Sequence, residues 1–240
     1  MSNSGSPEIS VIIPMHNEGP NVWPLAEQVF SVFAPASRPI ELILVDDAST
    51  DDTWQQIQRA RSKFPQLRGI RHQRQSGQSA ALWTGFRASR GQLLATLDGD
   101  LQNDPADLPR LLGELKDADL VCGVRAKRMD TSLRRFSSLV ARAARNAMLG
   151  VDFRDSGCNL RAFKRSVLEL VPAFDGFHRF FPILAHGAGA VVKEIPVSHR
   201  PRTAGKSKYG VWNRLGRGIY DLMMVRWYCK RQFKTGACEE

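Results

Sequence analysis

The chain has 240 residues, of which 42% are hydrophobic and 24% are charged. These proportions are ordinary for a globular protein and exclude a chain that is disordered throughout. Lysine and arginine outnumber aspartate and glutamate by 34 to 24, so the formal net charge is +10. Nucleic acid, anionic lipid headgroups and phosphorylated substrates all fit such an excess, and the charge alone does not select among them.

The sequence lacks the signals of export and of a metal site built on cysteine. Its four cysteines are widely spaced and form no CxxC pair, which predicts reduced, metal-free thiols. The first residues, MSNSGSPEIS, do not have the basic-then-apolar order of a signal peptide. The longest apolar run, 180–192, is shorter than the roughly 18 residues that span a bilayer. We therefore expect a cytoplasmic protein, for which contact with a membrane surface stays possible.

The first half of the chain alternates between strand and helix patterns. Strands are predicted at 8–14, 39–45, 67–72 and 92–97, and helices at 21–33, from 49–52 to about 64, at 78–88 and from 104 onward. Short β-branched runs favour buried strands, whereas Asp104 and Pro105 are typical of a helix start. This alternation predicts an α/β fold with a doubly wound parallel sheet.

The second half is less regular. We expect a strand at 119–124, a helix ending near 149, a late strand at 190–197 and a basic loop at 200–209. The chain divides into a disordered start at 1–7, one domain at 8–210, and a basic C-terminal helix and tail at 211–240.

Polar clusters follow three of the predicted strands, at His16-Asn17-Glu18, Asp46-Asp47 and Asp98-Gly99-Asp100. In doubly wound sheets, ligands bind beyond the carboxyl ends of the strands. The clusters therefore predict one binding site at that edge of the sheet.

The DGDLQ segment offers hard oxygen ligands to one Mg²⁺ or Mn²⁺ from Asp98, Asp100 and Gln102. A lone DxD is more often a solvated turn, but its place at a strand end beside two other acidic clusters favours a metal site. Asp46 and Asp47 repel each other as neighbours, so a role in holding a base, a ribose or a metal would account for them.

Two basic segments are candidate phosphate sites. The loop at 200–209 places four cations around a glycine and a serine, a composition able to wrap a diphosphate, although a solvated loop has the same composition. Arg125, Arg134 and Arg135 are similarly ambiguous as single residues.

In the tail, Trp212, Leu215 and Ile219 share a helical face with Leu222 and Met223, which is typical of either a core helix or an interfacial helix.

Together these motifs resemble family 2 glycosyltransferases, and are most similar to the dolichyl- and polyprenyl-phosphate sugar transferases. The resemblance runs in family order through VIIPMHNE, LVDDASTDDT, GQSAALWTGF, LDGDLQNDP, GVR, DSGCNLRAF and RTAGKSKY, over about residues 8–210. This chain has His16 where the family commonly has a tyrosine, and its Cys158 and Asn159 depart from the usual pattern of the family. Many relatives carry transmembrane helices after the last motif, so peripheral attachment, through the tail or through a small membrane-protein partner, is expected here.

The resemblance implies a GT-A-type fold, a nucleotide-sugar donor and a divalent metal. It implies these roles: nucleotide-sugar binding by Pro14, Asn17, Glu18, Asp46, Asp47, Gln78 and Asp98; metal binding by Asp98, Asp100 and Gln102; catalysis by Asp100, Arg125 and Asp155; and binding of donor or lipid phosphate by Arg125, Arg134, Arg135, Arg202, Ser207 and Lys208.

The expected reaction is an inverting transfer of a hexose from a UDP- or GDP-sugar to undecaprenyl or dolichyl phosphate, at the inner face of the cytoplasmic membrane. A polyprenyl phosphate is already anionic and needs no strong base. The alternative is transfer to a sugar hydroxyl in polysaccharide or lipopolysaccharide synthesis, for which Asp155 is the first candidate base. Nucleic-acid binding would leave the acidic clusters unexplained, and the chain has no recognisable nucleic-acid reading motif.

Overall fold

The structure, a computed structural model, describes residues 6–36, 38–125, 146, 150–200 and 211–231. Over these residues the chain forms a seven-stranded sheet with the strand order β3-β2-β1-β4-β6-β5-β7. The strands are β1 (Ile9–Met15), β2 (Ile40–Asp46), β3 (Leu67–Arg71), β4 (Leu93–Thr96), β5 (Leu120–Arg125), β6 (Arg161–Lys164) and β7 (Val192–Val197). The principal helices are α1 (Gly19–Phe33), α2 (Thr53–Lys63), α3 (Gln78–Ala88), α4 (Leu108–Gly113), α6 (Val167–Leu170), α7 (Phe177–Gly187) and α8 (Val211–Arg231).

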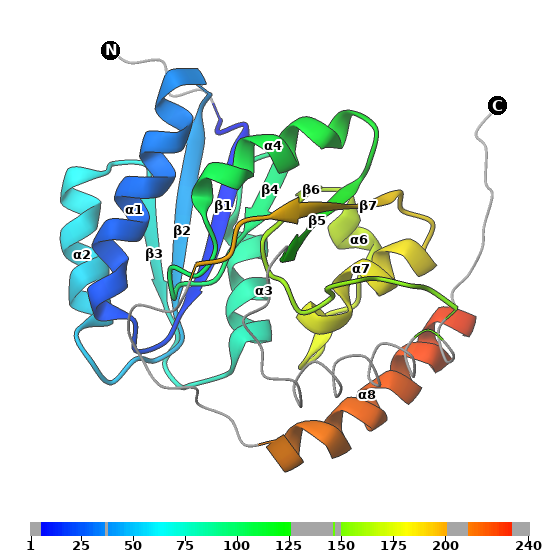
Figure 1. Ribbon diagram of the computed structural model, residues 1–240. Helices are drawn as coiled ribbons and strands as arrows, with labels where there is room; N and C mark the ends of the chain where they lie inside the picture. The colour runs from blue at the N-terminus through cyan, green and yellow to red at the C-terminus, as the bar shows by residue number, and fades with distance from the viewer. Residues whose placement is uncertain (1–5, 37, 126–145, 147–149, 201–210, 232–240) are drawn as a thin grey trace.

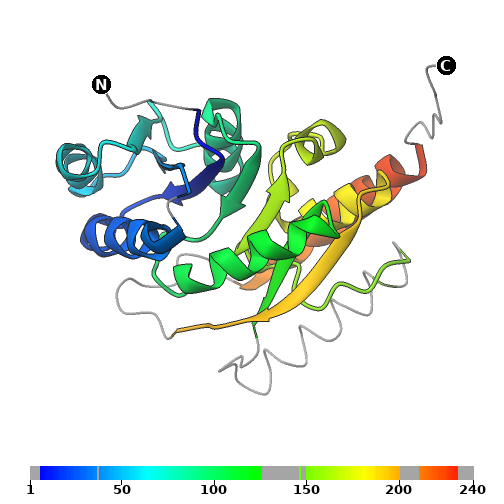
Figure 2. The ribbon, with the colours of Figure 1, turned by 90° about the horizontal axis from the view of Figure 1, so that it is seen from above.

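Helices cover both faces of the sheet, so its central strands are apolar along almost their whole length. Successive side chains of a strand point to opposite faces. Val11 and Ile13 on β1 therefore belong to the core beneath α1, α2 and α4, whereas Ile12 belongs to the core beneath α3, α6, α7 and α8. Figures 1 and 2 show these two helical layers with the sheet between them.

The second core is rich in aromatic residues and incorporates the last helix. Phe86, Phe163 and Phe181 meet with ring centroids 5.0 to 6.1 Å apart, at tilted or edge-on angles that such rings favour. Leu222 and Val225 of α8 are buried in the same core. The described part of α8 is thus packed on the domain, along the side that carries α7 (Figure 1).

The α/β fold predicted from the sequence is confirmed, with one difference in the sheet. β1, β2, β3 and β4 pair in parallel, as do β5 and β7, but β6 runs antiparallel to both β4 and β5. At four residues, RAFK, β6 is too short to show a clear alternation, so the sequence did not predict it. α6 and α7 were also not predicted, although the apolar run at 180–192 overlaps α7.

Where the predicted elements fall on described residues, their boundaries agree with the structure within about two residues, except that a short 3-10 turn, Pro105–Asp107, precedes α4. The predicted helix that ends near 149 and nearly all of the basic loop at 200–209 lie outside the described residues. Asp104 caps the turn before α4 as expected, because its Oδ1 accepts a hydrogen bond from the Ala106 N–H at 3.0 Å. The cap position of α2 is Asp52, and its neighbour Asp51 accepts a hydrogen bond from the Thr53 N–H at 3.0 Å. Within the described residues, no helix is both long enough and apolar enough to span a bilayer.

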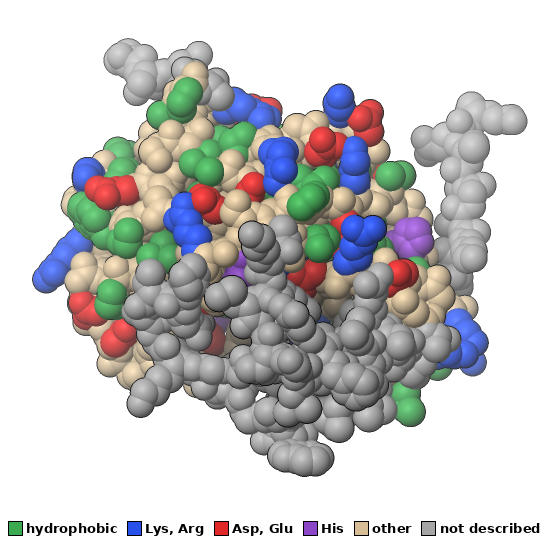
Figure 3. Space-filling view, viewed as in Figure 1, with side chains coloured by type: hydrophobic (Ala, Val, Ile, Leu, Met, Phe, Trp, Pro, Cys, Tyr) green, Lys and Arg blue, Asp and Glu red, His purple; other side chains and the backbone are tan. Residues whose placement is uncertain are grey.

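Charged side chains of both signs alternate over the described part of the face in Figure 3. Ion pairs also join elements within the described residues, such as Lys164 with Asp119 at 2.9 Å. On this part of the surface the positive charges are therefore interspersed with negative ones.

Candidate active site

The loops after β1, β2 and β4 each turn through a residue with left-handed backbone geometry. Asn17, Ala48 and Leu101 have φ values of 55°, 53° and 61°. Non-glycine residues adopt this region rarely, and such strained positions cluster at functional sites. Asn17 also joins the first two loops, since its Oδ1 accepts a hydrogen bond from the Thr50 N–H at 2.8 Å. The sequence-predicted clusters therefore meet at one edge of the sheet.

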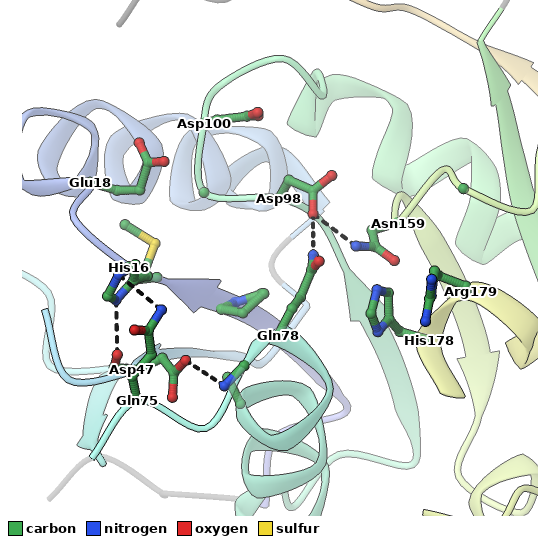
Figure 4. Close-up of a pocket in the computed structure, with 16 residues that line it drawn as sticks. His16, Glu18, Asp47, Gln75, Gln78, Asp98, Asp100, Asn159, His178 and Arg179 are labelled. Carbon is green, nitrogen blue, oxygen red and sulfur yellow. Dashed lines mark hydrogen bonds between the residues drawn. The ribbon is translucent and has the colours of Figure 1, made fainter. Parts of the chain in front are cut away.

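A cavity of about 430 Å³ opens at this edge. It is lined by Pro14, Met15, His16, Glu18, Asp47, Gln75, Gly77, Gln78, Ala81, Asp98, Gly99, Asp100, Gly157, Asn159, His178 and Arg179. Six of the residues predicted to act in the site are among them: Pro14, Glu18, Asp47, Gln78, Asp98 and Asp100. Figure 4 shows His16, Asp47 and Gln75 at one end, Asp98 in the middle, and His178 with Arg179 at the other end.

Asp98 lies at the centre of the cavity and is held from two sides. Its Oδ1 accepts hydrogen bonds from Gln78 Nε2 at 2.9 Å and from Asn159 Nδ2 at 2.8 Å (Figure 4). Gly99 packs the turn against the end of β1, where a Cβ would lie 2.6 Å from the sulfur of Met15. Only glycine therefore allows the two carboxylates to sit this close to the strand.

The electrostatics of the centre favour a positive partner. Burial raises the pKa of Asp98, the hydrogen bond from Asn159 lowers it, and the negative charge of Asp100 raises it, with a net upward shift. Two carboxylates that lie close together in a buried position resist ionising together. A cation between them would remove that penalty.

At the His16 end, Asp47 organises the loop that begins α3. Its carboxylate accepts hydrogen bonds from the N–H groups of Ser76 at 2.8 Å and Gly77 at 2.7 Å, and it contacts His72 Nδ1 at 2.7 Å. Its carbonyl contacts His16 Nδ1 at 2.9 Å. Asp47 thus shapes this end of the cavity through its neighbours as well as lining it.

The opposite end is built from the first turn of α7. His178 Nδ1 lies 2.7 Å from the hydroxyl of Ser79, and that hydroxyl accepts the N–H of Gly176 at 2.8 Å. Burial, and then the nearby positive charges of Arg161 and Arg179, lower the pKa of His178 to about 3. The imidazole is therefore neutral at physiological pH.

Three other predicted residues belong to the loops but do not line the cavity. Asp46 is fully buried, where its carboxylate pairs with Arg71 at 3.1 Å and accepts the Ser49 N–H at 3.0 Å. Asn17 joins the first two loops through Thr50, and Gln102 directs its Nε2 toward the carbonyl of Arg200 at 3.5 Å. These contacts stabilise the loops that carry the cavity-lining residues.

Arg125 and Asp155 form a partly buried ion pair next to the cavity wall, with side chains 21% and 4% exposed. Arg125 Nε and Nη2 donate to the two oxygens of Asp155 at 2.7 and 2.8 Å. A Cβ on Gly157, which lines the cavity, would lie 3.7 Å from Arg125 Nη2. The remaining predicted phosphate-binding residues lie outside the described residues: Arg134, Arg135, Arg202, Ser207 and Lys208.

The sequence did not identify several lining residues, chiefly Gln75, Asn159, His178 and Arg179. Asn159 belongs to the DSGCNLRAF motif, and its contact with Asp98 spans 61 positions of the chain. His178 and Arg179 belong to a helix whose first residues follow a glycine, Gly176, in left-handed geometry. No short sequence motif predicts contacts between residues so far apart in the chain.

The described residues contain no group of three or more His, Cys, Asp or Glu side chains that could hold a metal. Asp98 and Asp100 nevertheless fit a divalent ion, because Mg²⁺ is commonly held by one or two carboxylates together with substrate phosphates. Their oxygen ligands and the raised pKa of Asp98 are consistent with such an ion.

A mixed sheet of this order, with acidic loops at the carboxyl ends of its strands, is the GT-A fold of glycosyltransferases. Two solved structures share the fold. One is glucosyl-3-phosphoglycerate synthase from Mycobacterium tuberculosis in complex with Mn²⁺, UDP and glucosyl-3-phosphoglycerate, with a TM-score of 0.65, 22% identity, and coverage of 96% of this chain and 82% of that one. The other is a mannosyltransferase from Pyrobaculum calidifontis in complex with GDP-Man and Mn²⁺, with a TM-score of 0.63, 21% identity, and coverage of 97% and 66%.

Residues 10–171 match the family model described as glycosyl transferase family 2, and the chain belongs to that family of enzymes. It is 37% identical to a dodecaprenyl-phosphate galacturonate synthase of Rhizobium johnstonii, over 95% of this chain and 69% of the relative. It is also 37% identical to an undecaprenyl-phosphate 4-deoxy-4-formamido-L-arabinose transferase of Pseudomonas aeruginosa, over 90% of this chain and 64% of the relative. The chain thus spans about two thirds of the length of these relatives.

Proposed function

We propose that this glycosyltransferase transfers a sugar from a nucleoside diphosphate sugar to a polyprenyl phosphate, with inversion at the anomeric carbon. The observation that carries the proposal is the acidic centre of the cavity, Asp98 and Asp100. It occurs in a chain that is 37% identical to enzymes named for polyprenyl-phosphate acceptors. The sugar, predicted as a hexose, and the cytoplasmic membrane face both belong to this proposal.

Asp98 and Asp100 would hold Mg²⁺ or Mn²⁺, with Gln102 as the third predicted ligand. When bound, the ion supplies positive charge that stabilises the nucleoside diphosphate as it leaves. Gln78 and Asn159 fix one oxygen of Asp98 and so define the direction of its carboxylate. Preorganised contacts of this kind avoid reorganisation during the reaction.

The state of two candidate bases favours a phosphate acceptor over a sugar hydroxyl. Asp155, the base expected for the alternative, has both oxygens engaged by Arg125. His178 lines the cavity, but with a pKa of about 3 it is a very weak base at neutral pH. A phosphate oxygen is already ionised and attacks without losing a proton.

The exposed face of α8 supports contact with a membrane surface. Tyr220, Met223 and Trp227 are 73%, 58% and 59% exposed, and their spacing places them on one side of the helix. Aromatic side chains with nearby cations, here Lys230 and Arg231, suit the headgroup layer. The opposite side of α8 is buried, so the helix can remain packed on the domain while this face meets lipid.

Transfer of radiolabelled sugar tests the reaction directly. We expect label from one member of a panel of UDP- and GDP-sugars to enter an organic-extractable product with undecaprenyl phosphate and Mg²⁺ or Mn²⁺. Asp100→Ala should abolish that transfer, whereas Asp117→Ala, at an exposed carboxylate remote from the cavity, should not. Label in a soluble sugar acceptor with none in the lipid would reject the polyprenyl phosphate and support the alternative.

Sedimentation with vesicles tests the membrane surface. Wild-type protein should bind vesicles that contain anionic lipid, and Trp227→Ala should weaken the binding without changing thermal stability. Arg38→Gln, which removes a surface cation far from α8, is the matched control. Equal binding by all three proteins would exclude this face of α8 as the contact.

A further inference from the structure

Arg179 lines the end of the cavity that is farthest from His16 and Gln75 (Figure 4). It lies in the first turn of α7, at the positive end of the helix dipole, and that turn contains no acidic residue to offset the positive charge. A cation is unfavourable at this end of a helix. Some negative charge must therefore stabilise Arg179 in this place.

Asp221 of α8 provides part of that charge. Arg179 Nη2 donates to Asp221 Oδ2 at 2.7 Å, and the two side chains are 40% and 15% exposed. The pair packs over Gly176, where a Cβ would lie 2.6 Å from Arg179 Nη2. The position of Arg179 is thus set jointly by α7 and α8.

The guanidinium has unused hydrogen-bonding capacity. An arginine carries five N–H donors, and among the described residues Asp221 engages one of them, on Nη2. The buried Nε has no hydrogen-bond partner among the described residues. Arginine matches phosphate oxygens with paired donors, and it remains charged at any physiological pH.

We propose that Arg179 binds the phosphate of the lipid acceptor. This inference rests on the proposed function, and it assigns to the acceptor a residue that the sequence motifs do not contain. Three observations carry it: Arg179 faces the cavity, it lies opposite the His16 end, and it is paired to α8.

The acceptor is favoured over the donor as the source of the phosphate because of the neighbouring helix. α8 carries the exposed Tyr220, Met223 and Trp227, so a lipid headgroup would enter the cavity from the α8 side. The nucleotide residues predicted from the sequence, such as Glu18 and Asp47, come from the loops after β1 and β2. The two phosphate sources are therefore expected at different ends of the cavity.

Calorimetric titration with farnesyl phosphate, a short prenyl phosphomonoester, tests the assignment in the presence of Mg²⁺. Arg179→Gln should weaken the binding by about 10- to 100-fold, because a hydrogen bond to a charged group is lost. Arg179→Lys should recover part of the affinity, since it keeps the charge but not the paired donors. Arg38→Gln, which breaks an exposed ion pair far from the cavity, should bind as the wild type does.

Titration with UDP and GDP distinguishes the two phosphate sources. Their affinities should stay within about twofold of wild type in Arg179→Gln, since an uninvolved surface charge contributes little. Loss of nucleotide affinity instead would assign Arg179 to the donor and overturn the proposal. Unchanged farnesyl phosphate binding in Arg179→Gln would also overturn it, as would failure of the wild type to bind this ligand.

The steady-state constants give a second readout that a purely structural role would not reproduce. In Arg179→Gln the KM for undecaprenyl phosphate should rise while the KM for the donor is unchanged. A loss of stability would lower the active fraction and leave both KM values as they were. Absence of lipid transfer by the wild-type enzyme would refute the proposed function, whereas normal transfer by Arg179→Gln would refute this inference alone.

Discussion

The two ends of the cavity are built in different ways. At the His16 end, polar side chains are held by loops that directly follow buried strands, as when Asp47 accepts hydrogen bonds from the N–H groups of Ser76 and Gly77. At the α7 end, the side chains are fixed by contacts between distant segments, such as Arg179 with Asp221 and His178 with Ser79. A change at the first end should remove chemistry and leave the fold intact, whereas a change at the second should also affect stability.

The largest effect is expected from Asp98→Asn. The amide can still accept hydrogen bonds from Gln78 and Asn159 but lacks the charge to hold a divalent ion. Loss of several kcal/mol of transition-state stabilisation corresponds to about a 1000-fold fall in kcat. Sugar-transfer kinetics measure this fall, and Asp117→Asn is the exposed control. A fall of less than about tenfold would remove Asp98 from the metal site.

Asp155→Asn should act through stability more than through chemistry. It leaves the partly buried Arg125 without its charged partner, and because its side chain is 21% exposed the loss should be smaller than the roughly 3 to 5 kcal/mol of a fully buried pair. Urea unfolding measures the loss. Activity per folded molecule should remain near that of wild type if Asp155 serves only to stabilise the ion pair, and a kcat lowered by about 1000-fold in folded protein would instead support its role as a base.

Substitutions at two neighbouring residues of α8 test how much its buried side and its exposed side each contribute to stability. Leu222 is 6% exposed, and Leu222→Ala should lower the free energy of unfolding by about 2 to 3 kcal/mol. Met223 is 58% exposed, and Met223→Ala should change it by less than about 0.5 kcal/mol. Thermal or urea unfolding measures both. Similar values for the two variants would show that α8 does not pack on the domain as described.

A smaller effect, specific to pH, is expected from His178. Its folded pKa of about 3 lies below the ordinary value of 6.5, so the unfolded chain binds the extra proton between these values. The free energy of unfolding should therefore fall as the pH drops below 6.5, by at most about 1.4 kcal/mol per pH unit. Urea unfolding of wild type and His178→Gln from pH 7 to about 5 isolates this contribution, since most carboxylates titrate lower. Parallel curves for the two proteins would contradict it.

The same contrast explains what the sequence could and could not predict. Strands β1 and β2 are buried on both faces, so their apolar runs and the acidic residues after them were visible in short windows. β6 has only four residues, and α7 contains Pro182 within a nearly continuous run of buried apolar residues. Neither segment therefore shows a clear hydrophobic periodicity. Asn159 and Arg179 reach the cavity only after β6 and α7 have packed.

Individual roles were harder to predict than positions. Asp46 and Asp47 are adjacent and looked equivalent, yet alternation along the strand buries Asp46 beside Arg71 and leaves Asp47 at the cavity. Glu18 and Asp98, by contrast, both line the cavity. The motif identified the edge of the sheet, and side-chain direction decided which residue lines the cavity.

The anchoring of α8 by one side has a geometric consequence. Leu222 and Val225 hold the helix on the same core as α7, so the described part of α8 moves with the domain. A protein that adheres to a bilayer through such a fixed ridge keeps its freedom to spin and diffuse in the plane, but loses its freedom to tilt. The distance of the cavity from the lipid and its orientation relative to the bilayer would then be fixed by the angle at which α8 crosses the sheet.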